Sequence, residues 1–313
     1  MNNNKKFVKS SVVFVLAFLI LLFLIDILYI GLVLPQKHFY KSEAQFRQNS
    51  DDGLKILFAG DSHPSWAVNP QYIKNSFNYA VPTETYEQTY YKMRKVLNEK
   101  NSIEVLALPY DLHSFANYQS NPWSEVRYWS EFMDADELGK SSNKSIASVY
   151  LYKYFPFLGK GNDFRIILFP GEKSTVISGW QQREEVLTDA KKDAKQKAEL
   201  QFRNYPGIID EKLLDFFLRA LDLAEGKHKK VILIKYPITN EYKAALEAKG
   251  IKRGEFYSDL NKKISKYGYV QVLDYQDLFD NNSLFSDSNH LNKNGAEIFS
   301  KRLNEDLRDS IID

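Results

Sequence analysis

The chain contains no cysteine among its 313 residues. This absence excludes catalysis by a thiol, disulfide bonds and zinc sites with cysteine ligands. The chain also has no large excess of positive or negative charge. It contains 42 basic and 40 acidic residues, and the formal net charge is +2. Such a balance gives no electrostatic reason to expect a nucleic-acid partner. The chemistry of this protein must therefore come from other side chains.

Several signatures of bound groups are absent as well. The sequence has no glycine-rich phosphate loop, and His38, His113 and His228 show no metal-ligand spacing with acidic residues. We therefore predict no metal site and no cofactor. No internal repeat or low-complexity linker interrupts the chain.

A long apolar run is present near the start. Val12–Leu34 is almost unbroken apolar sequence, interrupted by Asp26 and by small residues. Its length suits a bilayer core of about 30 Å. A cleaved signal peptide has a shorter apolar region and a small-residue cleavage site, and no clear Ala-x-Ala follows this one. The pattern favours an uncleaved signal anchor over residues 10–34, after a short tail over residues 1–9.

The orientation of this anchor follows from its flanks. Three lysines precede the run and three basic residues follow it closely, so the positive-inside bias is weak. The short tail and the large following domain favour an N-terminus inside and a domain outside the cytoplasm. Asp26 is either an intramembrane functional acid or partner contact, or it lies near one membrane face and reaches water. We favour the second interpretation.

The rest of the chain predicts a polar stalk over residues 35–53 and one α/β domain over residues 54–313. Short apolar runs predict strands, and helical patterns separate most of them, which is typical of a parallel sheet covered on both faces. The predicted strands are Lys55–Ala59, Phe77–Ala80, Glu104–Leu108, Lys230–Tyr236 and Tyr269–Asp274, and the predicted helices are Thr85–Glu99, Asp210–Gly226, Glu241–Lys249, Glu255–Tyr267 and Gly295–Leu307.

A long insertion separates the third and fourth predicted strands, over residues 112–229. Within it, Gln181–Arg203 is strongly helical in pattern. Val186, Ala190, Ala194 and Ala198 form a narrow apolar stripe there, and the rest is a charged face. A lid or packing helix fits this pattern better than a partner-binding helix.

Two short motifs carry the chemistry. Gly60-Asp61-Ser62-His63 follows the first predicted strand, and Asp287-Ser-Asn-His290 precedes the closing helix, for which Asn292 is a candidate N-cap. Ligands of parallel α/β sheets bind at the carboxyl ends of the strands. A serine nucleophile needs an imidazole to take its proton and a carboxylate to orient that imidazole. Each motif alone is weak, since Asp61 could simply cap a turn, but together they predict a catalytic triad of Ser62, His290 and Asp287.

These motifs resemble those of the SGNH or GDSL hydrolase superfamily. The resemblance implies a flavodoxin-like three-layer sandwich with a parallel sheet. It also implies that Ser62 is the nucleophile, His290 the base and Asp287 the residue that orients it. The N-terminal anchor adds a resemblance to exported acyl-transfer proteins of bacterial surface polysaccharides, either DltD-like or alginate-acetylation-like. That resemblance implies a protein of the bacterial cell membrane.

The sequence departs from the superfamily at the oxyanion hole. The second block normally carries a glycine whose N–H stabilises the oxyanion, and Ala80 stands at that position after Phe77-Asn78-Tyr79. The third block lacks the usual asparagine, which leaves Tyr110 or His113 as candidate donors beside the Ser62 amide. Losing one oxyanion donor typically costs about 10²–10³ in rate.

Other residues are candidates for substrate contact. His63 is either a contact to substrate or leaving group, or a first-turn helix residue, and the second interpretation is favoured. Asn78 is a further candidate. Trp123 and Trp129, like Tyr128 and Trp180, either stack on sugar rings or close the core of the insertion.

The residues and the resemblance together predict a membrane-anchored serine esterase or O-acyltransferase. Its substrate would be an acyl ester, in the first place acetyl, of a cell-surface polysaccharide. A transferase of this kind would receive its acyl group from a polytopic membrane partner protein. The alternative is a non-catalytic surface or assembly protein that kept the SGNH fold.

Overall fold

The computed structural model describes residues 2–48, 53–116, 118, 123–168, 176–203 and 209–311. Contacts divide the chain into two compact units. Unit 1 comprises Met1–Tyr40 and Trp123–Lys173, and unit 2 comprises Lys41–Pro122 and Ser174–Asp313. The first change from unit 1 to unit 2 along the chain thus follows residue 40, and the predicted domain start at residue 54 stays a prediction. The predicted insertion is split, because its first part packs with the N-terminal helix.

Unit 2 is built on a five-stranded sheet in which all neighbouring strands are parallel. Counted along the chain, the sheet strands stand in the order 2-1-3-4-5, which is the flavodoxin-like arrangement. All five predicted strands and the predicted α/β fold are confirmed. In spatial order the strands are β2 (Ser76–Asn78), β1 (Ile56–Phe58), β3 (Val105–Pro109), β6 (Lys230–Lys235) and β7 (Val270–Asp274).

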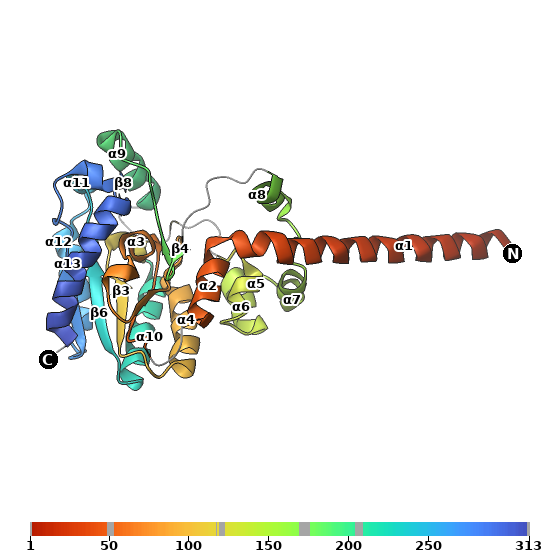
Figure 1. The fold of residues 1–313 in the computed structure, drawn as a ribbon, viewed down its shortest axis with the longest axis horizontal. Helices are drawn as coiled ribbons and strands as arrows, with labels where there is room; N and C mark the ends of the chain where they lie inside the picture. Colours follow the sequence, from red (N-terminus) through yellow and green to blue (C-terminus); the bar gives the residue numbers. More distant parts are fainter. Residues whose placement is uncertain are drawn as a thin grey trace. The chain divides into compact units, whose positions relative to one another are not determined.

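Helices cover both faces of this sheet. On one face, α13 (Lys293–Ile311) packs Phe299 and Leu303 into a core cluster with Phe58 and Ile232. The alternate strand residues point to the other face, where α4 (Tyr86–Glu99) pairs with α10 (Glu211–Gly226). Because both faces are covered, the strands are apolar throughout rather than alternating. Figure 1 shows these helices around β3 and β6.

The remaining predicted helices of unit 2 are confirmed with small shifts, as α11 (Asn240–Ala248) and α12 (Arg253–Ile264). The prediction for Gln181–Arg203 is only half right. The helix there is α9 (Ala190–Gln201), and Gln181 belongs to β5 (Trp180–Gln181), which pairs with β4 (Val176–Ile177). Ala194 and Ala198 are buried and α9 packs on α11, whereas Val186 is exposed. The helix therefore packs against the domain.

Residues 35–53 do not form an unpacked stalk. They contain α2 (His38–Gln48), and residues 49–52 lie outside the described part of the chain. Within unit 2, Phe46 is buried and stacks on Tyr79, with the ring centroids 4.2 Å apart. Gln45 donates from Nε2 to the Val176 carbonyl and accepts from the Gly179 N–H. The second part of α2 is thus docked on unit 2.

In the part of unit 1 that the structure describes, the N-terminal helix is combined with four short α-helices. By length and composition Lys5–Gln36 suits a membrane span or a signal sequence. The helix α1 (Asn2–Leu28) continues into a π-helical turn (Tyr29–Val33) and a 3-10 turn (Leu34–Gln36). Tyr29, Val33 and Leu34 are buried inside unit 1, so the end of the predicted span packs on protein. The short helices are α5 (Val126–Trp129), α6 (Ala135–Ser142), α7 (Ile146–Tyr154) and α8 (Arg165–Leu168).

Candidate active site

The turn after β1 places Ser62 at the carboxyl end of the sheet. Gly60 has φ of +120°, and a Cβ there would lie 2.5 Å from Cδ of Pro109, so only glycine fits. Asp61 then caps the short helix α3 (Ser62–Ala67) by accepting the His63 N–H at 2.9 Å. Ser62 is consequently the first residue of α3.

A hairpin before α13 positions the other two residues of the predicted triad. Asp287 ends β8 (Phe285–Asp287) and pairs with His290, which begins β9 (His290–Leu291). Asn292 then accepts the N–H groups of Asn294 and Gly295, both at 3.1 Å, and so starts α13. The predicted N-cap is therefore confirmed.

The three side chains meet at hydrogen-bond distances. Ser62 Oγ lies 2.8 Å from His290 Nε2. On the other side of the ring, His290 Nδ1 lies 2.8 and 2.9 Å from the two oxygens of Asp287. A proton on Nδ1 directed at the carboxylate leaves Nε2 free to accept the Ser62 hydroxyl proton. This is the arrangement that activates a serine.

Two cations of the insertion also reach the carboxylate. Lys197 Nζ on α9 lies 3.0 Å from Asp287 Oδ2, and Arg183 Nη1 lies 3.1 Å from the same oxygen. Lys197 Nζ is also 3.3 Å from His290 Nδ1, but both groups are donors, so the carboxylate is the partner of Lys197. Asp193, one helical turn earlier, accepts the Ser288 N–H at 2.7 Å. The i, i+4 spacing of Asp193 and Lys197 is the one sequence feature that could have indicated these contacts with the hairpin. In the sequence it is indistinguishable from the rest of the charged face of the helix.

The surroundings set the charge of the triad. Burial, opposed by Asp287 and assisted by Lys197, lowers the pKa of His290 to about 3. Burial alone would raise the pKa of Asp287, but His290 and Lys197 outweigh it and hold that pKa well below its usual range. At neutral pH the site therefore contains a neutral imidazole and an ionised carboxylate.

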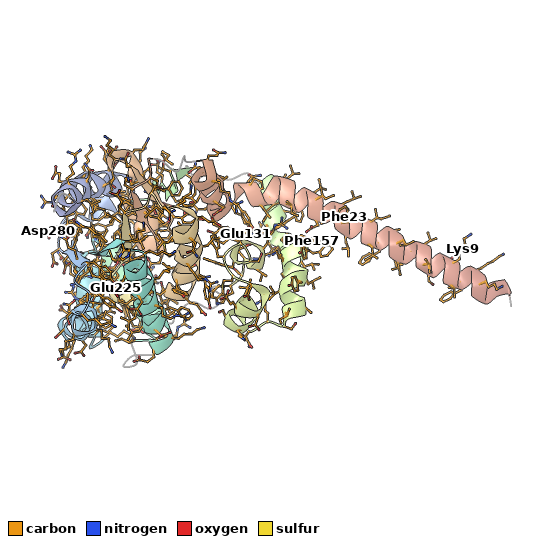
Figure 2. The ribbon with its side chains drawn as sticks, turned by 90° about the horizontal axis from the view of Figure 1, so that it is seen from below. Lys9, Phe23, Glu131, Phe157, Glu225 and Asp280 are labelled. Carbon is orange, nitrogen blue, oxygen red and sulfur yellow. The ribbon has the colours of Figure 1, made fainter. Side chains whose placement is uncertain are left out.

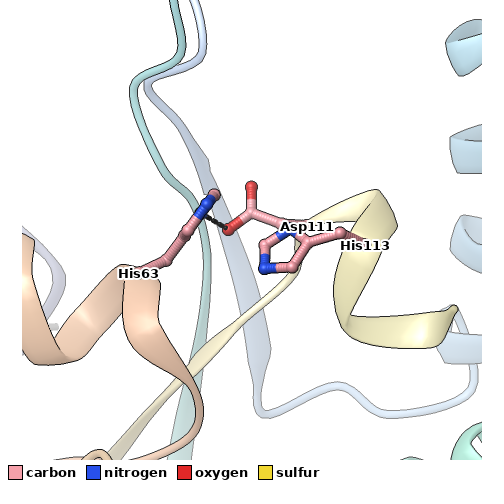
Figure 3. Close-up of side chains that lie close together, drawn as sticks. All are labelled: His63, Asp111 and His113. Carbon is pink, nitrogen blue, oxygen red and sulfur yellow. Dashed lines mark hydrogen bonds and ion pairs between the residues drawn. The ribbon is translucent and has the colours of Figure 1, made fainter. Parts of the chain in front are cut away.

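A second buried network adjoins the triad. It consists of two Asp-x-His pairs, Asp61 with His63 after β1 and Asp111 with His113 after β3. His63 Nδ1 lies 2.7 Å from Asp111 Oδ2, as Figure 3 shows, and His113 Nε2 lies 3.1 Å from Asp61 Oδ2. The His63 ring lies edge-on to His290, with the centroids 5.0 Å apart. Adjacent parallel strands thus bring together pairs that are about 50 residues apart in sequence.

The two contacts between the motifs, His63 with Asp111 and His113 with Asp61, differ in their protonation. Burial raises the pKa of Asp111 well above its usual value and lowers that of His63 well below its own. Burial disfavours the charged forms of His113 and Asp61 as well, but their mutual attraction raises the pKa of His113 and lowers that of Asp61. The network is therefore an ion pair of Asp61 and His113 beside a neutral pair of Asp111 and His63.

The same cluster contains three potential metal ligands. Donor atoms of His63, Asp111 and His113 lie within 4.8 Å of one another, which the spacing in the sequence did not predict. Both oxygens of Asp111 are engaged already, because Oδ1 accepts the Tyr236 N–H at 3.1 Å and Oδ2 pairs with His63. We therefore describe the cluster as a hydrogen-bonded network.

Most of the predicted oxyanion donors are engaged elsewhere. The Ala80 N–H donates to Asn78 Oδ1 at 3.2 Å, and the Tyr110 N–H donates to the Ile234 carbonyl at 2.7 Å. The Tyr110 hydroxyl donates to Asn261, and His113 is paired with Asp61. These contacts do not favour Ala80, Tyr110 or His113 as oxyanion donors, and that role stays a prediction for all three. The Ser62 amide stands at the first position of α3, where helix N–H groups have no intrahelical partner.

The predicted substrate contacts are mostly structural. The Asn78 amide donates to the carbonyls of Pro64 and Val68, at 2.6 and 2.8 Å, so it fixes α3. Trp123 and Trp129 are buried in unit 1 and pack on each other, so they close a core rather than stack on sugars. Trp180, in unit 2, is also buried and donates from Nε1 to the Trp66 carbonyl.

Among the described residues, the buried polar atoms near the triad that lack a protein hydrogen-bond partner include Nε2 of His63 and the side-chain amide of Asn289. His63 is a first-turn residue of α3, as the sequence favours, and its ring nonetheless lies against His290. Sequence reasoning missed Asn289, which follows Asp287 by two residues and gave no signal of its own.

Comparisons with known proteins give structural neighbours only. No protein-family model matches the chain, and no curated protein matches it. A provisionally named platelet activating factor from Streptococcus pneumonia is 14% identical, with a TM-score of 0.38 over 91% of this chain and 98% of that one. A provisionally named acylhydrolase from Bacteroides fragilis is 10% identical, with a TM-score of 0.42 over 86% and 94%.

A third solved structure, a provisionally named lipolytic protein of the G-D-S-L family from Desulfitobacterium hafniense, is 13% identical, with a TM-score of 0.37 over 80% of this chain and 98% of that one. TM-scores below 0.5 do not establish a shared fold. The assignment of a flavodoxin-like fold therefore rests on the strand order of unit 2 itself.

Proposed function

We propose that this chain is a serine-dependent esterase or O-acyltransferase. The observation that carries the proposal is the 2.8 Å distance from Ser62 Oγ to His290 Nε2, with Asp287 on the other ring nitrogen. His290 accepts the hydroxyl proton as Oγ attacks the acyl carbonyl carbon. It then returns the proton to the leaving oxygen, and an acyl-enzyme remains on Ser62.

His63 completes the oxyanion hole in this proposal. A protonated Asp111 donates to His63 Nδ1, which places the imidazole proton on Nε2, the atom without a protein partner. His63 directly follows the nucleophile, and its ring lies against His290. The Ser62 amide and the His63 Nε2–H group then stabilise the negative oxygen of the tetrahedral intermediate. This pair replaces the glycine and asparagine of the resembled superfamily.

The burial of the site favours transfer over hydrolysis. Ser62 and His290 are only 8% and 7% exposed, and Lys197 ties α9 to the carboxylate next to them. Exclusion of water protects an acyl-enzyme until the acceptor arrives. We infer that the acceptor or ester is a cell-surface polysaccharide and that the acyl group, in the first place acetyl, comes from a polytopic membrane protein.

The proposed setting is the outer side of the bacterial cell membrane. The apolar helix α1 serves as an uncleaved anchor in this proposal, and unit 2 lies outside the cytoplasm. The support is the length and composition of Lys5–Gln36 together with the burial of its last residues in unit 1. An anchored enzyme stays close both to a membrane acyl donor and to polysaccharide at the cell surface.

Turnover of an aryl acetate by the purified full-length protein tests the activity. We expect Ser62→Ala to abolish turnover and Ser65→Ala, in the same helix, to retain it. Equal turnover by Ser62→Ala and the unmodified protein would contradict a serine mechanism. The polysaccharide arm needs cells: surface polysaccharide from a Ser62→Ala strain should lose ester groups. Unchanged ester content, with aryl acetate turnover intact in the unmodified protein, would contradict the substrate and not the chemistry.

The non-catalytic alternative has one observation in its favour. Ala80 and Tyr110, the predicted oxyanion donors, are both engaged elsewhere. A surface or assembly protein would need neither the triad geometry nor a neutral imidazole. A well-folded protein that neither turns over the ester nor changes the surface polysaccharide would support this alternative.

A further inference from the structure

The helix α7 of unit 1 presents an uncharged apolar face. Its exposed side chains fall on one arc of the helix, and the four large ones are 46–58% exposed. The opposite side is held in unit 1, where Val149 is buried and Arg127 donates to the Lys153 carbonyl at 3.0 Å. Contiguous exposed apolar side chains usually mark an interaction surface. We call this arc the α7 face; it comprises Ile146, Ala147, Tyr150, Leu151 and Tyr154.

Contacts within unit 1 hold the end of the N-terminal helix against residues that precede and follow α7, and against α8. Tyr29 donates from its hydroxyl to Asp163 at 2.6 Å, and its ring packs on Phe164 with the centroids 5.5 Å apart. Lys37 forms ion pairs with Glu125 at 2.8 Å and with Asp163 at 2.6 Å. These partners lie on both sides of α7 in the chain. Packing therefore determines the position of α7 along the axis of the N-terminal helix.

That position coincides with the expected edge of a bilayer. Lys9 is the last charged residue before the apolar run, and a hydrocarbon core of about 30 Å takes about 20 helical residues. The core beginning after Lys9 would thus end close to Tyr29. On the uncovered side of the helix, Ile27, Leu28 and Leu32 remain exposed and apolar at the same level. A bilayer placed in this way would still contact the uncovered side of α1 at the level where unit 1 packs on its other side.

The direction of α7 suits the plane of a membrane. In the view of Figure 1 it is seen nearly end-on beside α1, and in Figure 2 the helix leading to Phe157 runs across α1 rather than along it. A helix perpendicular to a membrane-spanning helix lies parallel to the bilayer surface. Helices that lie in this plane bury an apolar face about 5–10 Å into the boundary of headgroups and acyl chains.

We propose that the α7 face lies in the bilayer interface next to the point where α1 leaves the membrane. Ile146 and Leu151 would contact acyl chains, and Tyr150 and Tyr154, whose rings stack, would sit at headgroup level, where tyrosine is enriched. Unit 1 is then a cap that rests on the membrane. This inference rests on the anchoring role proposed above for α1. A partner protein on the same face is the competing occupant.

The absence of cysteine in the chain makes the test direct. Single cysteines are introduced into the full-length protein, labelled with an environment-sensitive fluorophore and reconstituted in phosphatidylcholine–phosphatidylglycerol vesicles. The test position is Leu151→Cys. Leu21→Cys, in the middle of α1, reports on the anchor, Lys140→Cys on the charged surface of unit 1, and Ile298→Cys on the surface of unit 2. Lipids that carry a quencher at a shallow or a deep position then measure the depth of each label.

We expect the Leu151 label to shift its emission to the blue in vesicles and to be quenched more by the shallow than by the deep quencher. The Leu21 label should be quenched more by the deep one, and the labels at residues 140 and 298 by neither. A Leu151 label that behaves like those two, with Leu21 still deep, would overturn the inference and leave the face to a partner protein. A Leu21 label outside the bilayer would instead overturn the anchor.

Discussion

The position of one proton decides the role of His63. The carboxyl of Asp111 has a pKa raised by burial, so it donates to Nδ1 and leaves Nε2–H without a protein partner. A histidine that acted as a base through the same pair would instead need an ionised Asp111. The two roles therefore predict opposite results for the amide variant of Asp111.

We expect Asp111→Asn to retain most of the activity, because the amide can donate to His63 Nδ1 while accepting the Tyr236 N–H. His63→Phe keeps the ring volume and removes the donor, so kcat should fall by about 10²–10³. KM should change little, since the interaction forms mainly in the transition state. Steady-state kinetics with unfolding midpoints checks both variants. A loss in Asp111→Asn as severe as in His63→Phe would contradict the oxyanion role.

The dependence of kcat/KM on pH tests the protonation state of His290. Its folded pKa of about 3 lies below that of an ordinary histidine, so the imidazole stays neutral and can act as a base through the whole range above pH 4. We expect kcat/KM to show no fall near pH 6.5. Lys197→Met removes a positive charge that disfavours the imidazolium, so the pKa of His290 should rise and the acidic limb should move to higher pH. An unmodified protein with a limb near pH 6.5, or no shift in the variant, would contradict this charge arrangement.

At the scale of elements, the strand-to-helix turn after β1 positions Ser62, the proposed nucleophile. Gly60 has a positive φ and contacts the Pro109 ring, so a methyl group there meets both backbone strain and a rigid neighbour. Strained backbone of this kind costs about 1–3 kcal/mol. We expect Gly60→Ala to lower the free energy of unfolding by about that amount and to reduce turnover by moving Ser62.

Gly254 provides the matched control for this variant. It lies in α12, and a Cβ there has no neighbour within 4 Å. Gly254→Ala should leave turnover unchanged and keep or raise stability, because alanine favours a helix over glycine. Chemical denaturation of both variants measures the difference. Equal effects of the two substitutions would show that the turn does not need its glycine.

The elements of unit 2 were predictable where local pattern and tertiary contact agree. The buried strands are recognisable in the sequence as apolar, β-branched runs. Thr85 and Asp210 are of residue types that favour the N-cap position, and their side chains cap α4 and α10. The start of the helix predicted at Gln181 was wrong because contacts outweigh propensity there. The Leu187 N–H donates to the Phe285 carbonyl, and the Lys293 N–H donates to the Arg183 carbonyl, which holds this segment along the hairpin and the start of α13.

The site was predictable only in part for a similar reason. Ser62, Asp287 and His290 stand in motifs with their own turn and hairpin residues, so sequence sufficed to bring them together. Which amide remains available for an oxyanion depends on side-chain contacts, such as Asn78 accepting the Ala80 N–H. The pairing of His63 with Asp111 depends on the adjacency of β1 and β3, which no local pattern encodes.

At the scale of the whole molecule, the chain passes from unit 1 to unit 2, back to unit 1 and again to unit 2. In the proposed arrangement unit 1 holds the anchor and unit 2 the active site outside the cytoplasm. Protease added to intact cells or spheroplasts should therefore digest unit 2. Protection until lysis would reverse the orientation. A mature form that lacks residues 10–34 would show that the apolar helix is cleaved.

The most direct test of the central claim is the covalent adduct of a fluorophosphonate probe on the full-length protein, located by mass spectrometry of its peptides. A serine activated by His290 and Asp287 should carry the probe on the peptide that contains Ser62. Labelling should vanish in Ser62→Ala and nearly vanish in His290→Ala, because triad members act as a unit. A folded protein that takes up no probe, or carries it on another serine with Ser62 unmodified, would contradict the account.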